Sequence, residues 1–154
     1  MTSPIAAEAL IPNPRLALFG PFIGVWNTVG QHNMMPGVTL HGRTAFEWHE
    51  AGGFVCVRSD IDEPRIPSAI AIIGSDDHSD GFNMLYFDER AISRRFEMAI
   101  EGRVLRWWRL VTDFSQRYVL TVSLDGKTLH GVSSLCKDGK HWEQDMEQSY
   151  SREL

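Results

Sequence analysis

The chain has 154 residues, of which 43% are hydrophobic and 23% charged, and its formal net charge is -5 at pH 7. A chain of this length and composition can bury a hydrophobic core without a structural metal or a disulfide. The negative net charge argues against nucleic acid as a partner, because a duplex-binding surface normally carries net positive charge.

Cys56 and Cys136 are the two cysteines, and they lie far apart in the sequence inside apolar patterns. Two such residues are expected to be small buried side chains in a reducing compartment rather than a disulfide. Prolines and an acid interrupt the apolar run at the N-terminus, which is not typical of a secretory signal. No stretch reaches the roughly 20 apolar residues that span a bilayer. We therefore expect a cytoplasmic protein without a membrane partner.

Residues 1–14 are rich in small residues and proline, and they are expected to form a flexible lead to a single domain over residues 15–154. The sequence NPRLALF predicts a short helix or helical turn, with Asn13 near the N-cap and Pro14 at the first helical position. This helix is expected to plug one end of the domain.

From Val25 onward, apolar residues recur with period two, and glycine-containing turns break the pattern at short intervals. The pattern predicts about ten strands and leaves no room for a long helix. The predicted strands cover residues 25–31, 38–50, 54–61, 69–75, 82–89, 92–100, 103–111, 116–124, 127–136 and 141–150.

About ten consecutive antiparallel strands expose two unpaired edges unless the sheet closes on itself. The sequence therefore predicts an all-β fold, a single closed up-and-down barrel with the short helix at one end. A β-sandwich is the alternative, but sandwiches normally need longer crossing connections than the short hairpin turns found here. A barrel of about eight to ten strands is wide enough to enclose a small ligand.

The sequence GVWNTVG opens the first strand. Trp26 is placed to lay its ring across one end of the barrel, Gly24 lets the helical turn approach closely, and Gly30 permits a sharp bend. This motif resembles the calycin superfamily, in which G-x-W on the first strand follows a short N-terminal helix.

Three further segments, AGGFVCVRSDI, IIGSDDHSDGFNMLYFDE and the final QSYSRE, resemble bacterial lipocalin-like families of unknown function. The likeness covers most of residues 15–152. It implies a lipocalin-like barrel that binds a small molecule, and fatty-acid-binding proteins are more distant members of the same group.

The nitrobindins, one branch of that superfamily, hold haem through a histidine in the last strand. In HWEQDMEQSYSRE, the matching position is occupied by Gln144, Asp145 or Met146, and His141 lies at the start of the strand. A thioether from Met146 alone would be an unusual haem anchor. We therefore predict no cofactor and keep a haem-binding, nitrobindin-like protein as an alternative.

One arginine lies on a mostly apolar face of each of three predicted strands: Arg58, Arg94 and Arg106. An arginine among inward-facing aromatic side chains can bind a carboxylate or phosphate with both arms of its guanidinium group. The hypothesis is therefore an anionic amphipathic or hydrophobic small ligand. The predicted ligand-binding residues are Trp48, Arg58, Tyr86, Arg94, Arg106, Trp108, Tyr118, His130 and Met146. The alternative is that these arginines form solvated cross-strand pairs with acids such as Glu47 and Glu97.

Trp107 and Trp108 are adjacent, so in a strand they must point to opposite sides of the sheet. The outward tryptophan could mark a self-association surface and hence a homodimer, or it could pack under the N-terminal segment.

The six histidines show no close metal-binding spacing, and the chain has no nucleophile elbow, P-loop or Rossmann fingerprint. We predict no catalytic or metal-binding residues, with an enzyme acting on a lipid-like substrate as an alternative. A third class is an interaction module whose barrel is filled by its own side chains, such as Met84, Phe96 and Met98. The interior volume would distinguish a filled barrel from a binding protein.

Overall fold

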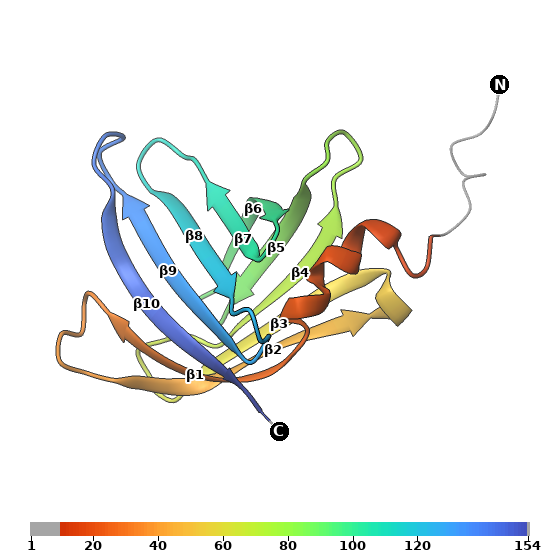
Figure 1. The fold of residues 1–154 in the computed structure, drawn as a ribbon. Helices are drawn as coiled ribbons and strands as arrows, with labels where there is room; N and C mark the ends of the chain where they lie inside the picture. The colour runs from red at the N-terminus through yellow and green to blue at the C-terminus, as the bar shows by residue number, and fades with distance from the viewer. Residues whose placement is uncertain (1–9, 154) are drawn as a thin grey trace.

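A computed structural model describes residues 10–153, which form a closed barrel of ten antiparallel strands (Figure 1). Each strand pairs with its neighbours in the sequence, and β1 closes the barrel against β10. The strands are β1 (Gly24–His32), β2 (Leu40–His49), β3 (Phe54–Ile61), β4 (Ala69–Ser75), β5 (Phe82–Asp88), β6 (Ile92–Glu101), β7 (Val104–Arg109), β8 (Ser115–Val122), β9 (Thr128–Cys136) and β10 (Glu143–Arg152). The predicted up-and-down barrel is confirmed, and the sandwich alternative is wrong.

The predicted flexible lead over residues 1–14 lies for the most part, in residues 1–9, outside the described residues. Among residues 10–153, no helix is long and apolar enough to cross a membrane. Cys56 and Cys136 are both buried and free, as the sequence predicted. A short turn of 3-10 helix, η3 (Glu50–Gly52), joins β2 to β3.

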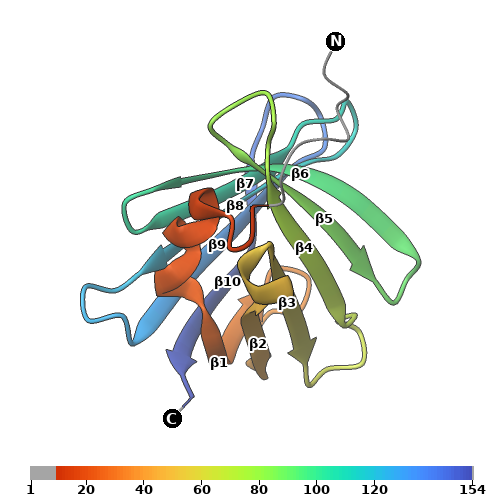
Figure 2. The same cartoon turned by 90° about the vertical axis from the view of Figure 1, so that its right-hand side faces the viewer.

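The 3-10 helix η2 (Pro14–Phe22) covers one end of the barrel, where β1 begins and β10 ends (Figure 2). Asn13 caps it as predicted, because its side chain accepts a hydrogen bond from the backbone N–H of Arg15 at 3.1 Å. Leu16, Phe19 and Phe22 are fully buried and extend the barrel core at this end. The predicted helical plug is confirmed.

Trp26 and Arg152 lock η2 to the barrel wall. The indole Nε1 of Trp26 donates to the carbonyl of Phe22 at 3.0 Å, and the guanidinium carbon of Arg152 lies 4.2 Å from the centre of the indole ring. Arg152 also donates to the carbonyls of Ile23 at 2.7 Å and Pro21 at 3.1 Å. Gly24 has a φ of 143° and no room for a Cβ beside the Arg152 guanidinium, which explains the glycine of the G-x-W motif.

The ring of Tyr118 on β8 crosses the inner surface of β9 over Gly131. A Cβ at Gly131 would lie 2.8 Å from two carbons of that ring. Tyr118 is also stacked on Trp107, with ring centroids 4.3 Å apart and planes 10° from parallel. A side chain at Gly131 would therefore displace an aromatic pair in the core.

We predict that Gly131→Ala lowers the free energy of unfolding by about 1–3 kcal/mol, the usual cost of overpacking a core. Gly74→Ala on β4 is the matched control, because nothing lies within 4 Å of a Cβ built there. Chemical denaturation of the two variants measures the difference. Equal stability of the two variants would contradict the assigned packing of Tyr118.

Candidate functional site

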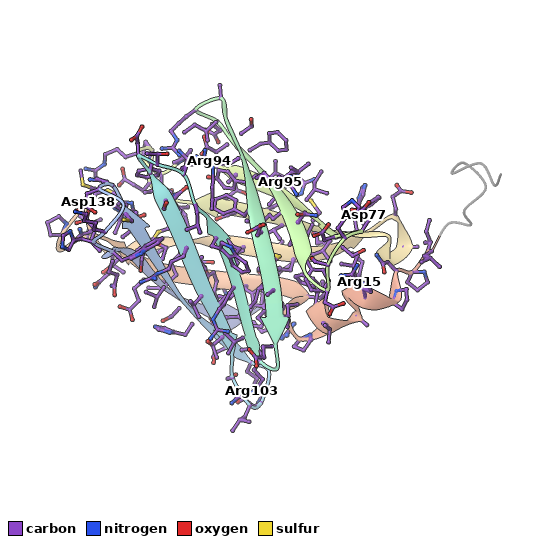
Figure 3. All side chains as sticks on the ribbon, turned by 90° about the horizontal axis from the view of Figure 1, so that it is seen from above. Arg15, Asp77, Arg94, Arg95, Arg103 and Asp138 are labelled. Carbon is purple, nitrogen blue, oxygen red and sulfur yellow. The ribbon has the colours of Figure 1, made fainter. Side chains whose placement is uncertain are left out.

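The end of the barrel opposite η2, where β6 begins and β7 ends, is called the mouth below. A pocket of about 860 Å³ lies there, lined by Arg94, Arg109 and residues 110–115. Figure 3 shows Arg94 on the side of the barrel toward Asp138, away from Arg15 on η2. The mouth is thus the end of the barrel that η2 does not cover.

Strand alternation turns Arg94 and Arg109 into the barrel. On β6, Arg94 shares a face with Phe96 and Met98, which are buried in the core. On β7, Arg109 shares a face with Leu105, which is fully buried, and with Trp107, which packs against the core. Both arginines follow these core residues toward the mouth, so their guanidinium groups lie at the outer limit of the apolar interior.

Arg94 and Arg109 form no ion pair with an acid of residues 10–153. Arg94 donates to the side-chain oxygen of Gln116 at 2.9 Å, and its guanidinium carbon lies 5.4 Å from the centre of the Phe114 ring. Burial lowers the pKa of Arg94, and the positive charges of Arg109 and Arg90 lower it further. Within the described residues, the mouth therefore holds two arginines without an ion-pair partner, and Asp113 is the one acid that lines the same pocket.

The carboxylate of Asp88, which lies beside these arginines, is already ion-paired. It pairs with Arg90 at 2.7 Å and accepts a hydrogen bond from the Tyr86 hydroxyl at 2.8 Å. Hydrogen bonding to Arg90 holds the pKa of Asp88 well below its ordinary value, at about 2, and burial raises the pKa of Tyr86 to about 12. Asp88 is thus ion-paired with Arg90, and its negative charge offsets that of Arg94 only in part.

The lowered pKa of Asp88 predicts an acid-dependent loss of stability. A group whose pKa is lower in the folded state stabilises the fold above its unfolded pKa, and loses that contribution as the pH falls through the folded value. We expect wild type to lose stability relative to Asp88→Asn between about pH 4 and about pH 2, and to keep a constant difference from it between about pH 5 and 7. Urea denaturation across this pH range measures the difference, and parallel pH profiles would contradict it.

Deeper in the barrel, aromatic and hydroxyl groups form the wall. The rings of Tyr86 and Phe96 meet edge to face with centroids 6.2 Å apart. The Tyr118 hydroxyl lies 2.8 Å from the side-chain oxygen of Gln148 and 2.6 Å from the hydroxyl of Tyr150, whose own hydroxyl donates to the same oxygen. Burial raises the pKa of both Tyr118 and Tyr150, so these hydroxyls stay protonated at neutral pH and are donors rather than bases.

The structure brings four of the nine predicted ligand-binding residues to the inward faces: Tyr86, Arg94, Tyr118 and Met146. Tyr86 and Arg94 lie directly opposite each other on β5 and β6. Trp48 lies at the other end of the barrel, in a separate pocket of about 420 Å³ against Pro12 and Pro14. It is therefore distant from the mouth in the fold.

The predicted inward orientation of the other four residues, Arg58, Arg106, Trp108 and His130, is corrected. On β3 the core residue is Val55, which puts Arg58 on the outer face, and on β7 the core residue is Leu105, which puts Arg106 and Trp108 outside. The indole of Trp108 donates to Glu97 at 2.8 Å on that outer face.

His130 on β9 is also exposed, and its imidazole lies 2.8 Å from the carboxylate of Glu147. The prediction that one of the adjacent tryptophans points inward is confirmed, and the inward residue is Trp107.

Arg109 and Gln116 belong to the mouth and were not among the predicted ligand-binding residues. They lie directly opposite each other on β7 and β8. The signal for Arg109 is its spacing of two residues from Trp107, which becomes informative once Trp107 is known to face inward. Gln116 has no signal of its own in the sequence, because its role depends on the side chain that reaches it from β6.

The residues present do not fit a haem held by histidine. Five of the histidines are exposed: His41, His49, His78, His130 and His141. The sixth, His32, is engaged at both ring nitrogens, since Nδ1 accepts the backbone N–H of Met34 at 3.0 Å and Nε2 lies 3.4 Å from Asp145. Within the described residues, no group of three or more metal-ligating side chains converges.

No family model and no curated protein sequence matches the chain. Solved structures do resemble it. The crystal structure of Rv2717c from M. tuberculosis aligns with a TM-score of 0.69 and 12% identity, over 92% of this chain and 98% of that chain. The S-type phycobiliprotein lyase CPES from Guillardia theta aligns with a TM-score of 0.58 and 8% identity, over 90% of this chain and 92% of that chain. At such identities the likeness shows the fold alone, and that fold is a lipocalin-like β-barrel.

Proposed function

We propose that the barrel binds a small amphipathic anion at its mouth, with the head group between Arg94 and Arg109 and the apolar body against the apolar side chains that line the pocket. The observation that carries this proposal is the pair of inward-facing arginines at the edge of an apolar interior, which form no ion pair with an acid of residues 10–153. Maintaining such charge costs stability unless an anion compensates it, because burial and like charges both oppose ionisation.

The shape and chemistry of the mouth suit a carboxylate better than a neutral group. A guanidinium group binds a carboxylate with two parallel charged hydrogen bonds, which are stronger than bonds between neutral groups. Gln116 holds one arm of Arg94, which fixes the direction of the remaining donors. Leu110, Val111 and Phe114 line the same pocket and offer apolar contact to a hydrocarbon body.

Membership of the calycin superfamily and a cytoplasmic location are part of this proposal. The first is supported by the contact between Trp26 of the G-x-W motif and Arg152 of the last strand. The second is supported by two free thiols, Cys56 and Cys136, which are typical of a reducing compartment.

Two fluorescent probes that differ only in charge test the proposal. Dansyl-labelled undecanoic acid carries a carboxylate, and its methyl ester has nearly the same shape without the charge. We expect the acid to bind about tenfold or more tightly than the ester, since charged hydrogen bonds contribute about 1.5–3 kcal/mol. Tighter binding of the ester, or no saturable binding of the acid, would contradict an anion site.

A further inference from the structure

The outer surface of three adjacent strands, β3, β4 and β5, carries a cluster of exposed apolar side chains. Phe54, Ile72, Leu85 and Phe87 are each at least 42% exposed, and these strands lie side by side (Figure 2). Contiguous exposed apolar surface of this kind marks an interaction site more often than isolated apolar residues do. The outer patch is defined here as Phe54, Ile70, Ile72, Leu85 and Phe87.

A charged residue lies at each side of the outer patch. The strand register places one row across the sheet, running from Glu47 on β2 through Cys56, Ile72 and Leu85 to Arg95 on β6. Glu47 and Arg95 are exposed, and neither belongs to an ion pair within residues 10–153. The row is therefore negative at one end, apolar in the middle and positive at the other end.

We propose that the outer patch is the interface of a homodimer whose two-fold axis runs parallel to β4. Rotation about this axis reverses the row, so that Ile72 faces Ile72 of the second copy and Glu47 faces Arg95 of the second copy. An axis across the strands would instead place Glu47 against Glu47 and Arg95 against Arg95, with like charges opposed. The charges thus select one of the two symmetric ways of pairing the same apolar face.

In the next row of the sheet, the same rotation also brings favourable partners together. This row runs from Arg58 on β3 through Ile70 on β4 to Phe87 on β5. The same rotation places the Arg58 guanidinium against the Phe87 ring of the second copy, a favourable cation–π pair. Because the outside of a barrel is convex, the two copies approach most closely along β4 and diverge toward β2 and β6, so the flanking charges act across a gap.

The dimer goes beyond the proposed ligand binding and does not depend on it. The outer patch faces away from the barrel interior, whereas Arg94 and Arg109 face into it. A dimer formed in this way leaves both mouths unobstructed by the residues of the patch. The two proposals can therefore fail separately.

Sedimentation equilibrium of the full-length chain at tens of micromolar tests the dimer. We expect wild type to be a dimer and Ile72→Glu to be a monomer, because the variant opposes two carboxylates at the axis. Val29→Glu is the matched control, since Val29 and Ile72 are both 42% exposed and Val29 lies on the outer face of β1. A monomeric wild type, or a dimeric Ile72→Glu, would overturn the proposal.

Charge exchange tests the direction of the axis. Glu47→Arg and Arg95→Glu are each expected to weaken the dimer by about tenfold, because each puts like charges together at two symmetric contacts. The double variant, Glu47→Arg with Arg95→Glu, restores opposite charges and should return to the wild-type dissociation constant. A double variant no tighter than the single ones would contradict an axis parallel to β4.

Discussion

Replacing Arg94 by glutamine is expected to lower the affinity of the barrel for dansyl-labelled undecanoic acid by about tenfold to hundredfold. The variant removes a charged, bidentate donor that faces the pocket, while glutamine keeps a polar side chain of moderate length. Arg109→Gln should produce a loss of similar size. With both arginines replaced, the acid should lose its advantage over its methyl ester, because the two guanidinium groups that favour a carboxylate are then gone. Fluorescence titration measures the affinity of the wild type and of each variant for the acid, and that of the double variant for the ester.

Arg106→Gln is the matched control for these variants. Arg106 lies on the same strand as Arg109 but is exposed on the outer face, so its loss should leave the affinity for the acid unchanged. Arg94→Lys keeps the charge without the planar fork and should retain only part of the affinity. Equal losses in Arg94→Gln and Arg106→Gln would show that the effect comes from net charge rather than from the mouth.

Arg94→Gln has a second expected consequence, in the absence of ligand. Burial and the neighbouring positive charges of Arg109 and Arg90 lower the pKa of Arg94, so the charged group opposes folding in its surroundings. The unliganded variant should therefore be at least as stable as wild type. A residue that opposes stability yet favours binding is characteristic of a functional position.

Trp26→Ala is expected to lower the free energy of unfolding by about 3–5 kcal/mol, the largest stability effect anticipated for this chain. The indole is completely buried, and it carries both the hydrogen bond to Phe22 and the stacked guanidinium of Arg152. Its loss would leave a cavity under η2 and release the guanidinium from its stacking partner. Denaturant unfolding measures the effect, and a loss below about 1 kcal/mol would contradict the role assigned to this contact.

Substitution of Arg152 should also lower the free energy of unfolding. Arg152→Lys is expected to be less stable than wild type. One ammonium group cannot reach the carbonyls of Pro21, Ile23 and Gly126, all of which the guanidinium group binds. Arg43→Ala is a suitable control, since the exposed pair of Arg43 with Glu153 should contribute little. Equal stability of the lysine variant and wild type would show that charge alone matters at Arg152.

The sequence predicted the strands well, because their boundaries depend on local signals. β3 and β4 have the predicted ends, and Asn13 caps η2 as expected. These features depend on alternation, turn residues and capping, all of which act over a few neighbouring residues.

The inward faces were predicted correctly only where the two faces of a strand differ in polarity. On β6, Phe96 and Met98 mark the inner face clearly. On β7, both faces carry a tryptophan and an arginine, so alternation alone could not choose between them. On β3, the exposed Phe54 of the outer patch made the outer face look like a core face.

The composition of the mouth was the least predictable feature. Arg94 and Arg109 lie on different strands, and their proximity depends on how the barrel is closed and on which faces turn inward. Gln116 and Asp88 matter because of the side chains they bond, which no pattern within their own strands reveals. Cross-strand partners of this kind require the register of the folded sheet.

The most direct test of the account is heteronuclear NMR of the protein with isotopically labelled arginine side chains, titrated with undecanoic acid. Signals are assigned by comparing wild type with Arg94→Gln, Arg109→Gln and Arg106→Gln. We predict saturable shifts of the Arg94 and Arg109 side-chain signals, with Arg106 on the outer face unmoved. Saturable shifts confined to outward-facing arginines, or unmoved signals of Arg94 and Arg109 at saturating acid, would contradict an anion site at the mouth.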